Sequence, residues 1–430
     1  MRRLPGCSRR SKTVPRAEGS GDPLAGVRVV AFEQAVALPF ATFALAEMGA
    51  EVIKIERAPS GDRVRGLGLV KGGQSTYYVQ HNHSKRSLGL DLQKPRAREL
   101  LLKMIPNVDV VVENFAPGVI GELGFGYQAL RAINPRIVMC SVSAVGQTGP
   151  LSYKPGYDYI GQAYAGVTDL IGEPDRPPAS MTIAIGDVST GVAAAMAVGF
   201  ALLNRERTGE GTYIDASLLD TYFHMHELSV PVISLRPGRW VPKRSGSMHQ
   251  TSAPQGVFKA NGGFIYLAVL PNEWPRLLRA MHKTELGEDP RFNTDRVRLK
   301  NNQALREIIE SWLQSFPSLE AALKALDEER VPCAPVLTVA ESMNLAHIRE
   351  RGTVRKISDP TLGEFEIPGM PVKFSSWPGR ADLSASLLGA DNEAVLKETL
   401  GLGDAEIAAL YADGILIQDA ALQPRSVAAE

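Results

Sequence analysis

The sequence predicts an α/β fold, with a parallel sheet in a large domain and a second, smaller α+β domain. Apolar strand-like runs alternate with helical patterns along the first half of the chain, and this alternation is typical of βαβ units, whose strands pair in parallel. After Gly246 the composition changes to a hairpin pattern followed by three helical patterns. The 430 residues are 44% hydrophobic and 22% charged, which is enough for more than one buried core.

The first predicted βαβ unit opens the large domain. A β-branched run covers residues 26–31, a helical pattern follows at 39–48, and residues 51–55 form a second apolar strand. The loop after the first run lacks the GxGxxG glycines of a dinucleotide-binding turn, so we do not expect a nucleotide cofactor of that kind. In open α/β sheets the carboxyl ends of the strands form the edge where ligands bind. Further strands are expected at 109–113, 137–142 and 212–215. Helices are expected at 100–105, in a segment that ends at residue 132, in a segment that begins at residue 188, and in a segment that ends at residue 222.

Composition shifts along the chain set the expected domain boundaries. Residues 1–23 are expected to be a disordered leader, because they carry six basic residues and no acid before Glu18; organellar import stays an open alternative. The large domain is expected at 24–228 and 355–430, since the chain turns β-rich and then helical again near its end. Residues 229–354 are expected to hold linkers and the small domain, with a hairpin at 258–269 and helices at 274–281, 302–316 and 319–328.

The bulk composition argues against several function classes. Lys+Arg and Asp+Glu both number 47, so no global field attracts the chain to nucleic acid or to anionic lipid. The longest apolar run, residues 192–203, is shorter than the roughly 18 residues that a membrane span needs. Three widely separated cysteines argue against a disulfide framework or a zinc site and favour a reducing, cytoplasmic location. His224 and His226 are two residues apart and make a poor metal pair on a helix, so no metal is expected.

Asp187 stands at a predicted helix entrance and allows two interpretations. The β-prone residues 181–185 stop at Gly186, and the alanine-rich run begins at Val188. In the first interpretation the carboxylate is an N-cap that accepts a backbone amide one turn on. In the second, the helix dipole keeps a half-desolvated carboxylate ionised, so that it can act as a nucleophile. Gly186, without a Cβ, would then let another molecule approach the backbone closely.

Two basic features could meet an anion at the expected ligand edge. Arg57 follows the second strand of the first βαβ unit, and residues 81–87 form a basic, hydroxyl-rich loop that suits phosphate oxygens. A solvated surface charge is the alternative in both cases, and the residues alone do not decide between the two.

Several short motifs, taken in order and spacing, resemble the class III coenzyme A transferases of the CaiB/BaiF type, a family that also holds α-methylacyl-CoA racemases. The resemblance runs from about Leu24 to Leu402, and each motif alone is weak while the set is specific. The motifs are Gly49 to Arg57, Lys85-Arg86-Ser87, Asn114-Phe115-Ala116-Pro117-Gly118 with Leu123-Gly124, Ile133 to Val138, Gly146 to Pro150, Gly156-Tyr157-Asp158, Val331-Pro332 with Pro335-Val336, and Leu388-Gly389.

The resemblance implies a Rossmann-like large domain built from N- and C-terminal segments, and a homodimer of two interlocked chains. It implies that Asp187 is the catalytic aspartate and that a coenzyme A thioester is a substrate, with no permanently bound cofactor and no metal. The coenzyme A contacts that it implies are Val36, Ala37, Arg57, Asn82, Lys85, Asn114 and Phe115.

Departures from the family pattern bear on the choice of chemistry. Tyr157 stands where the racemases have a histidine, and an ordinary tyrosine is a poor base at neutral pH. We therefore expect a transferase, which moves coenzyme A from an acyl-CoA to a carboxylic acid, commonly a small dicarboxylate, through an aspartyl anhydride and an aspartyl-CoA thioester. A racemase and a non-catalytic CoA-binding protein are the alternatives. Glu122, Leu38 and Asp391 stand where family members often have arginine, glycine and histidine.

Overall fold

The computed structural model describes residues 21–379 and 383–422, so the expected leader at 1–23 lies almost wholly outside the described residues. The chain divides into two compact units. Unit 1 contains the chain up to Gln162, residues 184–222 and the chain from Gly352 onward, and unit 2 contains 163–183 and 223–351. Residues 163–183, which the sequence analysis placed in the large domain, group with unit 2, because Ala165 and Gly172 bond to His226 and Gly246 there.

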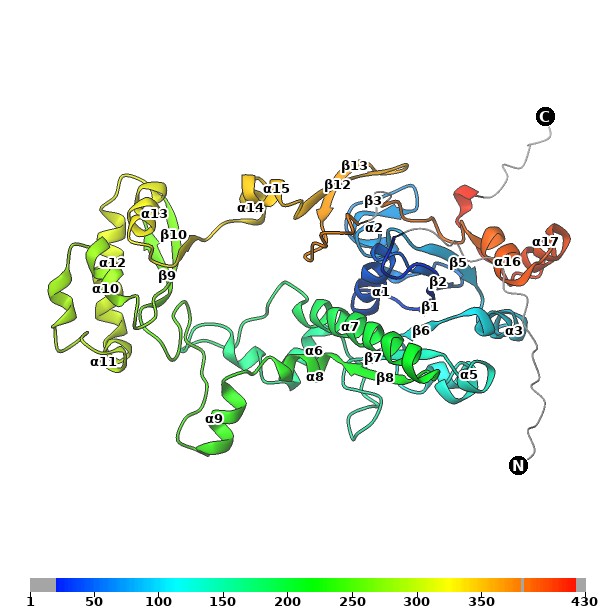
Figure 1. Ribbon diagram of the computed structural model, residues 1–430, viewed down its shortest axis with the longest axis horizontal. Coiled ribbons are helices and arrows are strands. Elements are labelled where there is room, and N and C mark those ends of the chain that lie inside the picture. Colours follow the sequence, from blue (N-terminus) through cyan, green and yellow to red (C-terminus); the bar gives the residue numbers. More distant parts are fainter. Residues whose placement is uncertain (1–20, 380–382, 423–430) are drawn as a thin grey trace, which may run out of the picture. The chain divides into compact units, whose positions relative to one another are not determined.

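Six parallel strands form the sheet of unit 1, in the order β5-β2-β1-β6-β7-β8 (Figure 1). The chain steps outward from β1 to β2 and β5, and then returns to β6, β7 and β8 on the other side. This is the Rossmann strand order, and its switch point lies between β1 and β6. The strands are β1 (Arg28–Phe32), β2 (Glu51–Arg57), β5 (Arg86–Leu90), β6 (Val110–Glu113), β7 (Val138–Ser143) and β8 (Tyr213–Ser217).

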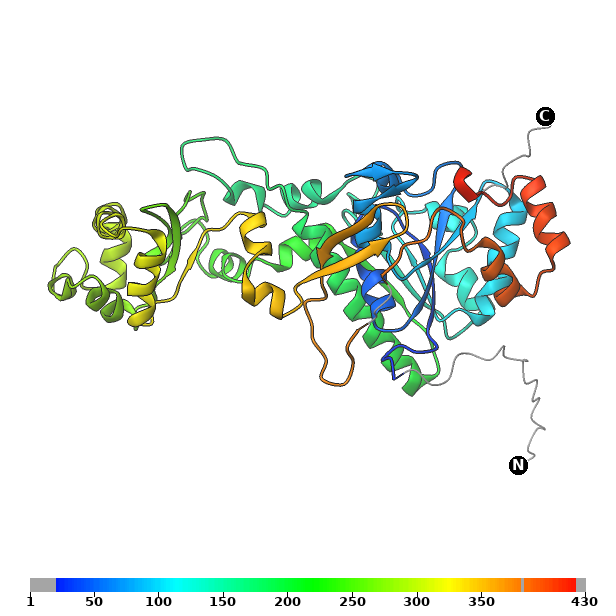
Figure 2. The same cartoon turned by 90° about the horizontal axis from the view of Figure 1, so that it is seen from above.

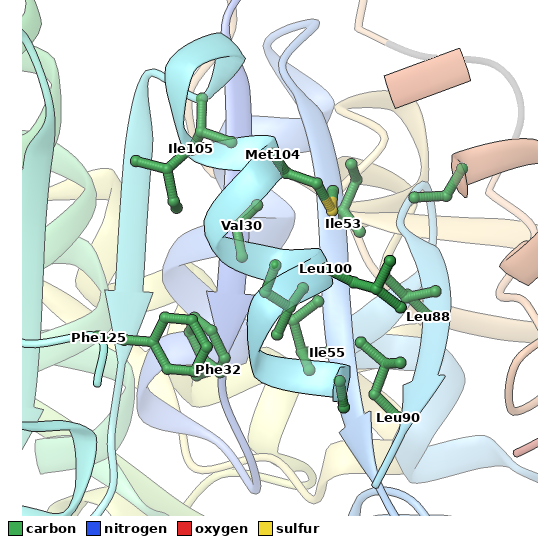
Figure 3. Close-up of a cluster of buried hydrophobic side chains, with 14 of the residues drawn as sticks. Val30, Phe32, Ile53, Ile55, Leu88, Leu90, Leu100, Met104, Ile105 and Phe125 are labelled. Atoms are coloured by element: carbon green, nitrogen blue, oxygen red, sulfur yellow. The ribbon is translucent and has the colours of Figure 1, made fainter. Parts of the chain in front are cut away.

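Both faces of this sheet are covered, because successive side chains of each strand point to opposite sides. Val30 and Phe32 of β1 pack with α3, α5, α16 and α17, and Phe32 lies 4.9 Å from Phe125 between ring centroids (Figure 3). Val29 and Ala31 pack on the other face against α1 and α7. The covering helices are α1 (Ala37–Glu47), α3 (Pro95–Met104), α5 (Tyr127–Ile133), α7 (Ile185–Thr208), α16 (Asn392–Leu400) and α17 (Asp404–Ala412).

The C-terminal segment closes the sheet edge at β5, and it lies beside the N-terminal strands in both views (Figures 1 and 2). The Ile417 amide donates to the Gly89 carbonyl at 3.1 Å, and the Gly89 amide donates to Asn392 Oδ1 at 2.8 Å. Gly89 is required there, since a Cβ would lie 2.3 Å from the Ile417 carbonyl oxygen. Asp391 accepts the Ser87 amide at 2.8 Å, which gives this departure from the family pattern a structural role.

Helix α7 begins earlier than the sequence predicted. The β-prone residues 181–185 form no strand, and the helix starts at Ile185. By length and composition alone α7 is apolar enough to cross a membrane, contrary to the expectation that no segment is long enough. Its apolar character has another explanation, because Ala194, Val198 and Leu202 are buried against the sheet and α1.

Unit 2 is the α+β unit that the sequence predicted. Strands β9 (Gln255–Ala260) and β10 (Gly263–Ala268) form the expected hairpin, and β11 (Cys333–Pro335) pairs with β10. The predicted helix at 319–328 is confirmed residue for residue. The helices of unit 2 are α9 (Ser229–Leu235), α10 (Trp274–Ala280), α11 (Asp295–Lys300), α12 (Asn302–Gln314), α13 (Leu319–Glu328), α14 (Val339–Met343) and α15 (Ala346–Glu350).

Shorter elements complete unit 1. They are β3 (Val70–Lys71), β4 (Gln74–Ser75), α2 (Thr76–Asn82), α4 (Val119–Glu122), α6 (Asp158–Tyr164), α8 (Leu218–His224), β12 (Val354–Asp359) and β13 (Gly363–Pro368).

Candidate active site

Asp187 lies in the first turn of α7, two residues after the helix begins. The N-cap position is Ala184, whose side chain caps nothing, so the interpretation of Asp187 as the N-cap is wrong. The Val188 amide already donates to the Ala184 carbonyl at 3.1 Å. No hydrogen bond to the Asp187 carboxylate is found among the described residues. Its oxygens therefore have their accepting capacity left for another group.

Asp187 faces the first turn of the sheet's opening βαβ unit. Gly191 lies one turn further along α7 and hence on the same side of the helix. A Cβ on Gly191 would lie 2.6 Å from the Ala37 carbonyl oxygen, so α7 and the start of α1 touch at that point. The candidate nucleophile thus stands beside the turn that the resemblance assigns to coenzyme A.

Gly186 serves packing within the chain. A Cβ there would lie 2.1 Å from Cε2 of Tyr222 and 2.5 Å from Oδ1 of Asp158. From the sequence, this glycine was expected to let another molecule approach the backbone. Instead, the missing side chain admits the Tyr222 ring from α8 and the Asp158 carboxylate from α6 against the start of α7.

The electrostatic surroundings of Asp187 favour its neutral form. Burial raises the pKa of Asp187 to about 7, and the nearby negative charge of Asp158 adds to this shift. A helix N-terminus carries partial positive charge, which acts in the opposite direction. The cavity of about 270 Å³ in unit 1 is lined by residues such as Glu47 at the far end of α1 and does not include Asp187.

Helix α2 adds a tyrosine to this site. Burial raises the pKa of Tyr77, and the negative charge of Asp187 raises it further, so the phenol stays protonated at neutral pH. The helix is fixed at its start by Ser75, whose hydroxyl accepts the Tyr78 amide at 3.1 Å. Tyr77 was not predicted as a site residue, because no motif in the neighbouring sequence indicates a catalytic or binding site.

The turn assigned to coenzyme A lies at the sheet's switch point. Val36 and Ala37 are buried at the start of α1. Ala35 before them has φ of 64°, an uncommon value for a residue with a Cβ, and its amide donates to Asp62 Oδ1 at 3.2 Å. This contact holds the backbone of the turn in place.

Asn114 links the two strands of the switch point. Its Oδ1 accepts the Gln34 amide at 2.9 Å, and its Nδ2 donates to the Gln34 carbonyl at 2.8 Å. Phe115 is half-buried, and its amide donates to Glu113. The structure therefore places Val36, Ala37, Asn114 and Phe115 along one edge of the sheet. Their contact with coenzyme A stays a prediction.

Asn82 and Lys85 have a different placement. The Lys85 ammonium is buried and donates to Glu33 Oε1 at 2.7 Å, to the Pro39 carbonyl at 3.0 Å and to Asn82 Oδ1 at 3.0 Å. Burial lowers the pKa of Lys85 to about 8. These contacts use all three ammonium protons, so Lys85 is available to hold the loop and not to meet a phosphate directly.

Two arginines of unit 1, Arg57 and Arg65, differ in exposure and in partners. Arg57 is the exposed last residue of β2, and no hydrogen bond or ion pair of its side chain is found in the described part of the chain. Arg65 is buried and makes a two-point ion pair with Glu56, at 2.6 and 2.8 Å. The role of Arg57 at the phosphate end of coenzyme A stays a prediction, whereas the guanidinium of Arg65 is occupied within the chain.

No group of three His, Cys, Asp or Glu side chains that could hold a metal ion is found among residues 21–379 and 383–422. The expectation of metal-free chemistry remains a prediction.

Comparison with known proteins decides the family. The family model described as CoA-transferase family III matches residues 24–392. The chain belongs to CoA-transferase family III. This confirms the resemblance that the motifs carried, and it makes the chain an enzyme of the CoA-transferase type.

Named relatives of this family III chain cover nearly its whole length. It is 32% identical over 397 residues to the succinyl-CoA–D-citramalate CoA-transferase of Chloroflexus aurantiacus, covering 92% of this chain and 98% of that one. It is 31% identical to the mouse succinyl-CoA:glutarate CoA-transferase, covering 92% and 91%. Among solved structures, a CaiB/BaiF family protein of Brucella suis matches with a TM-score of 0.77 and 30% identity, over 88% of this chain and 100% of that one.

Proposed function

We propose that this family III enzyme transfers coenzyme A from an acyl-CoA donor to a carboxylic acid, with Asp187 as the nucleophile. The supporting observation is the carboxylate itself, which has no hydrogen-bond partner among the described residues and is half-buried at a helix start. It lies on the side of α7 on which Gly191, one turn further, touches Ala37. A carboxylate in this setting is a stronger nucleophile than a solvated one once it is ionised.

The reaction needs four exchanges at carbonyl carbons and no net proton. An Asp187 oxygen attacks the acyl carbon of the donor, the C–S bond breaks, and coenzyme A leaves as a thiolate with the electron pair. The thiolate attacks Cγ of Asp187 in the resulting anhydride, so that the donor acid leaves as a carboxylate and an aspartyl-CoA thioester forms. The acceptor carboxylate attacks the same Cγ and expels the thiolate. The thiolate then attacks the acceptor's acyl carbon, which yields the new thioester and restores Asp187.

Each tetrahedral intermediate carries an oxyanion that needs a donor. The Val188 amide is occupied within α7, so the amide following Asp187 is not a donor. The Tyr77 hydroxyl, which stays protonated, is a candidate from the same unit. In the loop after β7, the Gly146 and Gln147 amides are bonded to Ser143 and Asp215, which leaves Thr148 and Gly149 as candidates there.

We infer that the acceptor is a small dicarboxylic acid. The relatives named above act on D-citramalate and glutarate, and both are dicarboxylates. Arg63 is exposed in unit 1, and its guanidinium donates to the Tyr157 hydroxyl at 3.2 Å. Tyr157 precedes Asp158, so this arginine is a candidate to hold the distal carboxylate.

An exchange assay tests the proposal. The enzyme is incubated with succinyl-CoA and, in turn, with mono- and dicarboxylic acids, and new thioesters are identified by mass spectrometry. We expect transfer to a dicarboxylate, and hydroxylamine should trap Asp187 as its hydroxamate when donor is present. No new thioester with any acid would contradict the transferase. Deuterium uptake at the α-carbon of a 2-methylacyl-CoA without an acceptor would favour the racemase.

We further propose that the enzyme works as a homodimer of interlocked chains, as the family resemblance implied. Helix α7 carries four large apolar side chains that recur every three or four residues on one face and are more than half exposed: Val192, Met196, Phe200 and Leu203. Contiguous apolar surface of this kind usually marks an interface. A second copy of the chain is the occupant to which the proposal commits.

Phe200→Glu tests this interface. A charge in the middle of the α7 stripe should shift the protein from dimer to monomer, because burying an unpaired carboxylate costs several kcal/mol. Mass is measured by light scattering after gel filtration at micromolar concentration. Ile133→Glu on α5, on the opposite face of the sheet, is the matched control and should stay dimeric. A monomeric wild type, or a dimeric Phe200→Glu variant, would refute the proposal.

A further inference from the structure

Asp158 is a buried carboxylate that the proposed steps do not use. Its side chain is 2% exposed, and α6 presents it against the start of α7. Oδ1 accepts the Tyr222 hydroxyl at 2.5 Å, and the Tyr222 hydroxyl in turn lies 3.2 Å from Gln162 Nε2. Oδ2 is buried and has no hydrogen-bond partner among the described residues. A buried carboxylate with one oxygen left without a partner is energetically costly, so Asp158 requires a functional or structural explanation.

The position of Asp158 is set by the backbone of α7. Oδ1 lies 2.5 Å from where a Cβ of Gly186 would stand, so the carboxylate touches the helix one residue before Asp187. The amides of Gly186 and Asp187 face it, and they are the groups that a helix N-cap normally satisfies. Ala184 caps nothing, and Asp158 takes that role from a different helix.

The negative charges of Asp158 and Asp187 are not compensated by a nearby positive side chain in the described part of the chain. The titratable side chains that interact with the pair are tyrosines: Tyr222 from α8 donates to Asp158, and the charge of Asp187 acts on Tyr77 from α2. No lysine, arginine or histidine among the described residues contributes to the pKa of Asp187. Two like charges that lie close together with no cation between them repel each other, and neither is easily ionised while the other is charged.

We propose that Asp158 is a positioning residue that acts through Asp187, holding the start of α7 and setting a negative charge against the nucleophile. The proposal rests on the assignment of Asp187 as the nucleophile. The repulsion raises the free energy of the free, ionised enzyme. Acylation removes it, because Asp187 becomes neutral in the anhydride and in the aspartyl-CoA thioester. Asp158 therefore favours formation of the covalent intermediates.

Asp158→Asn tests this proposal, because it keeps the size of the side chain and removes its charge. The acid limb of the kcat/KM profile, which reports ionisation of Asp187 in the free enzyme, should move down by roughly one pH unit. The ratio of acylated to free enzyme, measured with donor alone by hydroxylamine trapping, should fall about tenfold for each unit of that shift. Folding and coenzyme A binding are checked by circular dichroism and calorimetry.

Two control variants separate charge from structure. Asp158→Glu keeps the charge, so its acid limb should stay with that of the wild type even if the rate falls. Asp175→Asn makes the same change of charge on an exposed loop and should leave the profile unchanged. An unmoved acid limb in a folded Asp158→Asn that binds coenzyme A would overturn the positioning role and leave the nucleophile assignment intact.

If Asp158→Asn does not fold, the wild type still provides a test. Isotope-edited infrared spectra of the aspartate carboxyls should show Asp187 titrating in two steps, since interacting sites release their protons in macroscopic steps that belong to the pair. A single step at the pKa of an ordinary aspartate would overturn the proposal. Full activity of Asp187→Asn would instead remove the proposed function itself.

Discussion

Asp187→Asn should reduce coenzyme A transfer by roughly 10⁴-fold or more, since a side-chain amide cannot displace the thiolate and no covalent intermediate forms. Coenzyme A should still bind, because the residues assigned to it lie on other elements. Initial rates with the donor and acceptor found in the exchange assay measure the loss, and calorimetry measures binding. Asp187→Ala should behave in the same way, and activity near the wild-type level in either variant would refute the nucleophile.

The same variant should make the protein more stable at alkaline pH. Burial, with the charge of Asp158, raises the pKa of Asp187 from 3.8 to about 7 in the folded protein. The folded state therefore holds this proton more tightly than the unfolded chain, so stability falls as pH rises between about 4 and 7 and is constant above. Asparagine does not ionise, so the gain at pH 8 should be of the order of 2 to 4 kcal/mol.

Urea unfolding at pH 8 and pH 4 provides the comparison. The variant should exceed the wild type clearly at pH 8 and be close to it at pH 4, where Asp187 is protonated in the folded wild type. Equal stability of the two proteins at pH 8 would show that Asp187 is not desolvated as the structure has it. Loss of activity with a gain in stability is expected where a strained group serves catalysis.

The sheet could be predicted from sequence, whereas the start of its longest helix could not. Strands such as β1 and β6 are buried on both faces and appear in the sequence as continuous apolar, β-branched runs. The start of α7 has no such signal, because Ile183 and Ile185 favour a strand and Ala184 is a poor N-cap residue. The group that satisfies this helix is Asp158, and no local pattern connects it to Gly186.

The candidate site was likewise predictable from sequence only in part. Asp187 stood out because its glycine and the helix after it are local features of the sequence. Tyr77 and Tyr222 come to it from distant segments, and only the tertiary structure brings them together. The basic loop at 81–87 was expected to meet an anion, but Lys85 is buried, and its partner Glu33 lies 52 residues earlier. The sequence of a basic loop does not show which of its charged residues the fold will bury.

Lys54→Met should destabilise unit 1 by about 3 to 5 kcal/mol, the usual cost of leaving a buried charge without its partner. The Lys54 ammonium is fully buried, 2.8 Å from Asp62 Oδ2 and 3.5 Å from Glu33 Oε1. Burial lowers its pKa, but the carboxylates of Asp62 and Glu33 outweigh burial and raise it above the ordinary value. Removal of this cation leaves both acids short of positive charge.

The Lys54→Met substitution should also affect the candidate active site, because a series of contacts connects Lys54 to the turn before Val36. Lys54 holds Asp62, and Asp62 holds the Ala35 amide in the turn before Val36. When Asp62 is released, this strained turn should relax, and KM for the acyl-CoA donor should rise about tenfold or more while Asp187 keeps its place on α7. Urea unfolding and steady-state kinetics measure the two effects.

Lys71→Met is the matched control, because Lys71 is exposed and the substitution is the same. It should change stability by less than about 0.5 kcal/mol and leave KM unaltered. Adding Asp62→Asn to Lys54→Met removes an unpaired charge and should restore part of the stability, since neutral groups cost less to bury than ions. It should not restore KM to the same extent, because an amide holds Ala35 more weakly than a carboxylate does. If Lys54→Met unfolds at the urea concentration of the wild type, the buried cluster does not stabilise unit 1; if KM is unchanged, the cluster does not hold the turn before Val36.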